Sequence, residues 1–288
     1  DTYNALHLSL SRRFTTGLTT SLQYSWSHSY GTTQGSNEAL TVQNPFCFDC
    51  EKGDGPADIR HYFYAHALYE FPLGKGRRHL ASGVASALFG GWTIGGVANG
   101  RTGLPTNVFL ARPDVVNVDR ATDRIVSAAG PPPAGALAVI NTPGGGATRA
   151  TRRPDLIAGV SPYIKDRTSR QWLNPTAFSV PAPGTYGNLG RNALRGPGFL
   201  QFDLMLGRRL FLRERQSLEF RTEIFNVVNR ANFSNAPATL PNDLPRTQPG
   251  QPFSLFTTPG FGVITSTVGR TIGLGTSRQI QLGLRYSF

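Results

Sequence analysis

Residues 277–288, SRQIQLGLRYSF, decide the fold. Apolar residues occupy every second position of this stretch, and polar or small residues lie between them: Ile280, Leu282, Leu284, Tyr286 and Phe288 alternate with Gln279, Gln281, Gly283, Arg285 and Ser287. This period of two predicts a β-strand with one apolar and one polar face. Two kinds of protein carry such a strand, a transmembrane β-barrel and a soluble β-sandwich with this strand at its edge. Terminal residues of soluble domains are usually loose, so we favour the barrel.

A hairpin at the other end of the sequence supports the barrel. In residues 4–14 and in residues 18–30, apolar and polar side chains alternate, and Thr15-Thr16-Gly17 between the two segments suits a short turn. Pairing Phe14 with Leu18 places Leu10 opposite Leu22, so that the apolar faces coincide. A slip of one residue would destroy that match. The 13 residues of 18–30 also exceed the usual strand length of about 5–6 and fit a tilted membrane span.

A second hairpin repeats the design in residues 199–213 and 217–229, with a turn at 214–216. Two weaker candidates, 58–72 and 91–107, complete the set. Short and long connections alternate, as in membrane barrels with short periplasmic turns and long outer loops. The 73–90 connection is intermediate and could hold a short helix. We therefore predict an all-β, antiparallel segment of a transmembrane barrel with seven strands: 4–14, 18–30, 58–72, 91–107, 199–213, 217–229 and 277–288.

The composition restricts the possible classes. No run of 18 apolar residues exists, which excludes a membrane-spanning helix but not a barrel strand. The net charge of +12 is scattered, and no helical reading element accompanies it, so we expect no nucleic acid as partner. In outer loops the basic residues would face lipopolysaccharide. The opening DTYNALHLSL is strand-like and is not a signal peptide, and we expect the chain to be part of a longer protein.

Cys47 and Cys50 form a CxxC pair in NPFCFDCEKG. A redox pair should begin a helix, and a zinc site needs a second pair of ligands; the sequence shows neither. We expect a local disulfide in an exported loop, and no metal or other cofactor.

The acidic residues do not form a catalytic pair. Glu219 and Glu223 could act as acid and base, but Arg221 lies between them on the same strand face and Arg209 lies across the hairpin. We expect no enzymatic activity and a ladder of charges on the inner wall of the barrel, since barrel interiors are polar. The residues predicted to face the lumen, and to contact a plug or a ligand, are Asp203, Arg209, Glu219, Arg221, Glu223 and Arg285.

Five segments together resemble TonB-dependent outer-membrane receptors of the Oar-like type that is abundant in acidobacteria. They are DIRHYFYAHALYEFPLGKG (58–76), GGWTIGGVANGRTGLPTNV (90–108), WLNPTAFSVPAPGTYGNLGRNALRGPG (172–198), FDLMLGRRLFLRERQSLEFRTEIFNVVNRANF (202–233) and QLGLRYSF (281–288). The resemblance implies that residues 1–288 are the C-terminal portion of a larger barrel, with the plug and N-terminal domains outside this chain.

The resemblance also implies a function and partners. The protein would take up a scarce ligand, such as an oligosaccharide, peptide or siderophore, and contact the TonB complex through the N-terminal region. The barrel-assembly machinery would recognise Tyr286 and Phe288. The alternatives are a structural or adhesive outer-membrane protein without transport and a soluble carbohydrate-binding β-sandwich.

Two structural expectations follow from the barrel prediction. Seven strands leave an open sheet, because the smallest closed barrels have about 8 strands. One surface of that sheet should contact lipid, and we predict its members as follows: Leu6, Leu8, Leu10, Leu22, Tyr24, Trp26, Leu200, Phe202, Leu204, Leu206, Leu218, Phe220, Ile224, Ile280, Leu282 and Leu284.

Overall fold

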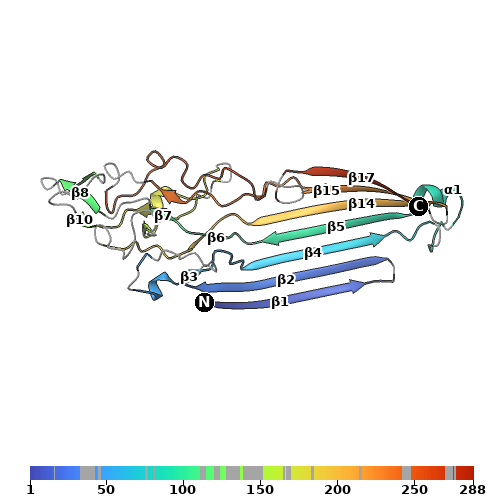
Figure 1. Ribbon diagram of the computed structural model, residues 1–288, viewed down its shortest axis with the longest axis horizontal. Helices are drawn as coiled ribbons and strands as arrows, with labels where there is room; N and C mark the ends of the chain where they lie inside the picture. Colours follow the sequence, from blue (N-terminus) through green and yellow to red (C-terminus); the bar gives the residue numbers. More distant parts are fainter. Residues whose placement is uncertain are drawn as a thin grey trace.

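The computed structural model contains one long antiparallel sheet (Figure 1). It describes residues 1–15, 17–32, 43–44, 47–74, 77–80, 82–110, 115–119, 124–127, 137–138, 152–164, 166, 170–182, 185–213, 216–241, 248–269, 275 and 277–288. Seven strands pair in chain order: β1 (Thr2–Arg13), β2 (Leu18–Gly31), β4 (His61–Glu70), β5 (Trp92–Arg101), β14 (Phe199–Arg213), β15 (Gln216–Phe225) and β17 (Gln279–Ser287). The short strand β3 (Gly53–Asp54) also pairs with β2.

All seven predicted strands are present, with corrections to their bounds. The strands expected at 58–72 and 91–107 are shorter and span His61–Glu70 and Trp92–Arg101. The strand expected at 217–229 ends at Phe225, because Asn226 has a φ of 51° in the left-handed region and turns the chain.

The first hairpin has the predicted register. Leu6 pairs with Trp26 and Leu10 pairs with Leu22. The turn is closed by the Phe14 amide, which donates to the Leu18 carbonyl oxygen at 2.7 Å, and Gly17 has a φ of 89°. Glycine adopts this conformation without the steric cost that a side chain would add.

The register carries one apolar face across the whole sheet. Leu8 pairs with Tyr24, Tyr24 with Phe63, Phe63 with Gly100, and Gly100 with Leu200. The same parity continues through Leu204–Ile224 and Ile224–Ile280, so all the residues predicted to contact lipid lie on this apolar face. Its side chains are open to the surroundings, and Leu282, for example, is 67% exposed.

Two strands alternate weakly in sequence because both of their faces carry unusual residues. On β4, tyrosines lie on the polar face at Tyr62 and Tyr64, while Ala65 and Ala67 lie on the apolar face. On β5, a Cβ atom at Gly95 would lie 3.0 Å from the Leu68 Cδ1 atom, so glycine makes room for the side chains of neighbouring strands.

The connections lie at two ends of the sheet (Figure 1). The turn end holds the described parts of the connections 14–17 and 71–91, the adjoining ends of β14 and β15, and the C-terminus; the predicted short helix, α1 (Gly83–Phe89), lies there. The loop end holds 32–60, 102–198 and 226–278. We call the described parts of these three connections the loop assembly.

Short elements run through the loop assembly. They are η1 (Asp49–Glu51), β6 (Pro105–Thr106), β7 (Phe109–Leu110), β8 (Val115–Asp119), β9 (Arg124–Ser127), β10 (Leu137–Ala138), β11 (Asp155–Leu156), η2 (Pro175–Ala177), β12 (Phe178–Ser179), β13 (Leu194–Arg195) and β16 (Thr239–Leu240). Two segments of these connections lie outside the described residues, the glycine-rich TPGGGATR (142–149) and the proline-containing PPPAGA (131–136).

The hydrophobic core lies in the loop assembly and not in the sheet. Phe178, Leu240 and Phe253 are at most 1% exposed, and they pack in one cluster that also contains Leu173 and Phe261. The Phe178 and Phe261 rings meet edge to face with centroids 5.7 Å apart. The long connections therefore fold onto each other as a packed unit.

The sheet is open, as seven strands require. Within the described chain, β1 pairs only with β2, and β17 pairs only with β15. The described residues contain no second large sheet against the apolar face, which a β-sandwich would need. No helix of the described chain is long and apolar enough to cross a membrane.

Candidate functional site: the charged wall and the loop-end cluster

The six charged residues predicted to face the lumen lie together on the polar face. They occupy β14, β15 and β17, and we call them the charged wall: Asp203, Arg209, Glu219, Arg221, Glu223 and Arg285. The register places Glu219 between Arg209 and Arg285. The alternation of these strands thus places all six charges on the face opposite the apolar side chains.

Most charges of the wall are paired. The Arg209 guanidinium donates to Glu219 at 2.8 Å, and Arg221 donates to Glu223 on the same strand. Asp203 accepts hydrogen bonds from the Gln201 side chain and the Asn226 amide, both at 2.8 Å. Arg285 makes no ion pair with any residue that the structure describes, although it lies opposite Glu219. The charged wall thus presents one cationic side chain, Arg285, next to charged residues that already have partners.

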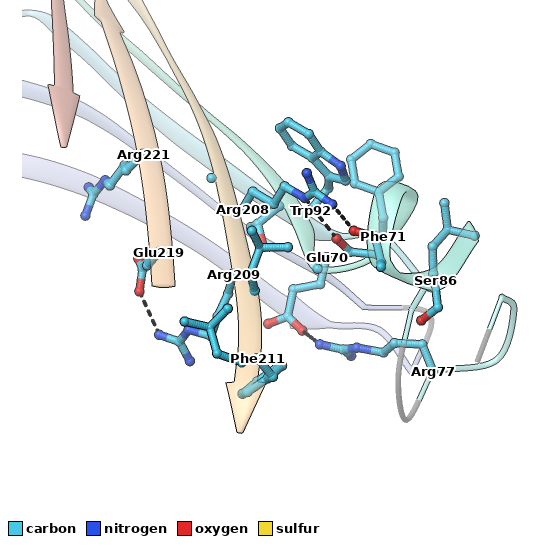
Figure 2. Close-up of a pocket in the computed structure, with 18 of the residues that line it drawn as sticks. Glu70, Phe71, Arg77, Ser86, Trp92, Arg208, Arg209, Phe211, Glu219 and Arg221 are labelled. Carbon is cyan, nitrogen blue, oxygen red and sulfur yellow. Dashed lines mark hydrogen bonds and ion pairs between the residues drawn. The ribbon is translucent and has the colours of Figure 1, made fainter. Parts of the chain in front are cut away.

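A cavity of about 890 Å³ continues the charged wall at the turn end (Figure 2). Leu68 and Met205 give it an apolar floor, and Glu70 accepts a 2.6 Å hydrogen bond from Arg77 at its edge. The Arg209–Glu219 pair of the charged wall also lines this cavity (Figure 2). This combination of apolar floor and charged rim suits a small polar ligand or a side chain of another domain.

A second charge cluster joins strands and loops at the loop end. Arg195 donates to both Asp54 and Asp58, and Arg60 lies 2.9 Å from Asp54 and 3.0 Å from Asp58. The Asp58 side chain is only 1% exposed, and it also accepts from the Ser29 amide. Burial alone would raise the pKa of Asp54, but hydrogen bonds from His28, Arg195 and Arg60 hold it below its ordinary value.

A buried ion pair fastens the 43–60 connection to the 152–198 connection. Both carboxylate oxygens of Glu51 accept from Arg153, at 2.8 and 3.0 Å, and neither side chain is more than 3% exposed. Burial raises the pKa of Glu51, yet the Arg153 hydrogen bonds and the backbone amides of Gln43 and Asn44 together hold it below its ordinary value. Charged partners of this geometry fix one arrangement of the loops.

The remaining predicted site residues lie apart from the wall charges. Cys47 and Cys50 are joined by a disulfide in the loop assembly, and Cys50 is the middle residue of η1. Tyr286 and Phe288 lie at the turn end of β17, with ring centroids 5.9 Å apart, and Phe288 is 92% exposed. The disulfide therefore belongs to the loop end, and the aromatic pair belongs to the opposite end.

Sequence reasoning missed both the loop-end cluster and the cavity. Arg195 is 137 residues from Asp58, and no periodic pattern relates them. The only local signal is the spacing of Asp54, Asp58 and Arg60 before a strand, which also occurs in ordinary turns. The cavity depends on α1. The sequence indicated that a short helix could form in 73–90, but it did not indicate where that helix would lie relative to the sheet.

Residues 1–281 match the family described as "Outer membrane beta barrel domain". This chain belongs to that family. Its apolar face is therefore a membrane-facing surface, and the protein is located in the outer membrane. No curated protein and no solved structure matches the chain. The soluble β-sandwich alternative is wrong on both grounds, the single open sheet and the family.

Proposed function

We propose that this barrel domain forms part of an Oar-like TonB-dependent receptor that takes up a scarce oligosaccharide, peptide or siderophore. The observation that carries the proposal is the charged wall on the polar face. A barrel domain that served only as an anchor would not need six charges gathered on three adjacent strands. A plug, or a ligand passing beside it, provides partners for them.

The orientation follows from the two ends of the sheet. Outer-membrane barrels have short periplasmic turns and longer extracellular loops. At the turn end β14 ends at Arg213 and β15 begins at Gln216, and the described residues of 14–17 join β1 to β2 there; the described parts of 102–198 lie at the loop end. We therefore assign the loop assembly to the extracellular side, where its basic residues meet lipopolysaccharide and its packed core holds a ligand-binding surface in a fixed shape.

The charged wall would bind a movable partner. Arg285 has no ion pair among the described residues, and Arg221 and Glu223 pair within one strand and so need no barrel partner. In this proposal the plug carries a carboxylate toward Arg285 and shifts when the TonB complex acts on the N-terminal region. The function is movement of the ligand and not its chemical conversion.

The alternative function is adhesion, and the loop assembly favours it because a packed, disulfide-containing surface can also serve as a contact surface. One experiment distinguishes the two. The host strain, a deletion of this gene and a strain lacking TonB are grown on defined oligosaccharides, on peptides as nitrogen source, or on ferric siderophores as iron source.

Uptake predicts that the gene deletion and the TonB deletion share a growth defect on one of these nutrient classes. An Arg285→Glu variant should reproduce that defect at wild-type outer-membrane abundance, and Gln281→Glu, four residues earlier on the same exposed face, serves as its control. Normal growth of the gene deletion on every class, with loss of surface attachment, would instead identify an adhesin.

A further inference from the structure

Helix α1 carries an apolar surface that no other described part of the chain covers. Val84, Leu88 and Phe89 are 76%, 57% and 57% exposed, and none of the seven residues of the helix is buried. Residues four apart lie on one side of a helix, which places Val84 and Leu88 together. Ser86 and Ala87, on the other side, line the cavity at the turn end (Figure 2). The helix is therefore two-sided, with small residues toward the cavity and large apolar ones away from it.

The helix is fastened to the apolar face of the sheet. Arg208 lies on that face of β14, paired with Trp92, and its guanidinium lies 5.1 Å from the centre of the Trp92 ring. The same guanidinium donates to the carbonyl oxygens of Ala87 and Leu88, the latter at 2.8 Å. These carbonyls end the helix and have no helical partner. The C-terminal end of α1 is thus held at the margin of the membrane-facing surface.

The adjoining chain is too tight to let the helix swing away. A Cβ atom at Gly90 would lie 2.6 Å from the Gly74 Cα atom, and one at Gly91 would lie 2.2 Å from the Arg209 carbonyl oxygen. Gly91 also has a φ of 74°, which suits glycine. The exposed apolar side of α1 is consequently a fixed feature at the turn end.

The residues around the helix match one kind of partner for its exposed apolar side. Trp92 and Arg208 lie on the apolar face next to it, and Arg78 is exposed in the same connection. Aromatic and basic residues gather where a membrane meets water, and amphipathic helices lie there with the apolar side among the acyl chains. We propose that α1 inserts Val84, Leu88 and Phe89 into the phospholipid leaflet next to the turn end, with Arg78 at the level of the phosphates.

The proposal is independent of ligand uptake. Only the assignment of this leaflet to the inner side of the outer membrane rests on the orientation proposed above. A vesicle experiment therefore tests it even if the protein transports nothing, because both leaflets of a simple vesicle are phospholipid.

The experiment places a spin label on each side of the helix. The only two cysteines of the chain are joined to each other, so Leu88→Cys adds a single reactive thiol to it. Any cysteine elsewhere in the full-length protein is first replaced by serine. The labelled protein is reconstituted in vesicles of phosphatidylethanolamine and phosphatidylglycerol, and collisions with oxygen and with a water-soluble nickel chelate are measured. Ser86→Cys, on the cavity side, is the matched control.

Lipid contact predicts that the ratio of oxygen to nickel collisions is severalfold higher at position 88 than at position 86. Val84→Cys should behave like Leu88→Cys, and it keeps the test available if one variant fails to assemble. Equally low ratios of oxygen to nickel collisions at 84, 86 and 88 would overturn the proposal, because the helix would then lie in water. Low collision rates with both reagents at 84 and 88 would also overturn it, because a protein would then cover the helix.

Discussion

The sheet and the loop assembly bury their apolar side chains in opposite ways. Of the buried hydrophobic side chains in the described chain, only Phe199 belongs to one of the seven long strands, at the first position of β14. The others lie in the loop assembly, where Phe178 and Phe253 are almost completely covered. The loop assembly therefore supplies its own core, while the sheet leaves Leu8, Leu282 and their neighbours for lipid to cover. One chain thus contains two folding environments.

Removal of Phe288 from the full-length protein should have the largest effect, because the sheet depends on delivery to a membrane and the loop assembly does not. Phe288 and the alternation before it offer a strand that assembly machinery can capture by strand pairing. We expect most of the protein to be lost from the outer membrane and degraded in the periplasm. Quantitative immunoblotting of outer-membrane fractions at matched expression measures this.

Phe288→Tyr is the control for that deletion, since it keeps an aromatic ring at position 288. It should retain wild-type abundance. Equal abundance of the deletion and the wild type would show that residue 288 is an ordinary end of a strand, and that delivery relies on another feature of the sheet.

Glu51→Gln should weaken the loop assembly and leave the sheet intact. The substitution leaves the buried Arg153 guanidinium without its counter-charge, and breaking such a pair typically costs about 3–5 kcal/mol. Trp172 lies in the loop assembly, so a Trp26→Phe, Trp92→Phe background makes its fluorescence a local reporter of urea unfolding.

Asp49→Asn is the matched control for Glu51→Gln. It removes a carboxylate from the same short helix, but the Asp49 side chain is 86% exposed, and its ion pair within the described chain is a surface pair with Lys52. We expect no measurable change, as is usual for exposed pairs. If both variants shifted the Trp172 transition equally, the buried pair would have no special role in holding the loops.

Leu204→Arg should act on the sheet and not on the loops. Arginine on the lipid face costs about 2–4 kcal/mol near the bilayer midplane and less near an interface. Gln281→Arg, which lies on the polar face of β17, should cost much less. Urea unfolding in phospholipid vesicles compares the two, and equal stabilities would place Leu204 outside the hydrocarbon layer.

The sequence predicts the sheet well because a period of two depends only on local alternation. The local alternation alone predicts that Leu10 lies opposite Leu22 and that Glu219 lies across the hairpin from Arg209, with no information about the rest of the chain. The loop core has no such period. Phe178 and Phe253 meet through connections of irregular backbone, and Arg195 reaches Asp58 across 137 residues. Contacts of that kind depend on the whole path of the chain, which local patterns do not encode.

The smallest expected effect is a change with pH that is confined to the loop assembly. Glu51 and Asp54 have pKa values below their ordinary values of 4.5 and 3.8, because hydrogen bonds from Arg153 to Glu51, and from His28, Arg195 and Arg60 to Asp54, hold the charged forms against the effect of burial. A carboxyl whose pKa is lowered by folding contributes stability above its unfolded pKa and loses it as the pH falls through the folded pKa. The Trp172 transition should therefore be constant from pH 7 to 5 and move to lower urea below about pH 4.5.

In Glu51→Gln that acid-induced shift should become smaller, because glutamine does not titrate and only the Asp54 contribution remains. A shift of full size in Glu51→Gln would assign the acid sensitivity to other carboxyls. Loss of the transition between pH 7 and 5 in the wild-type protein would show that groups titrating near neutrality hold the loops together, and not the buried arginine–carboxylate pairs. Either result would assign the stability of the loop assembly to charges other than the buried Glu51–Arg153 pair.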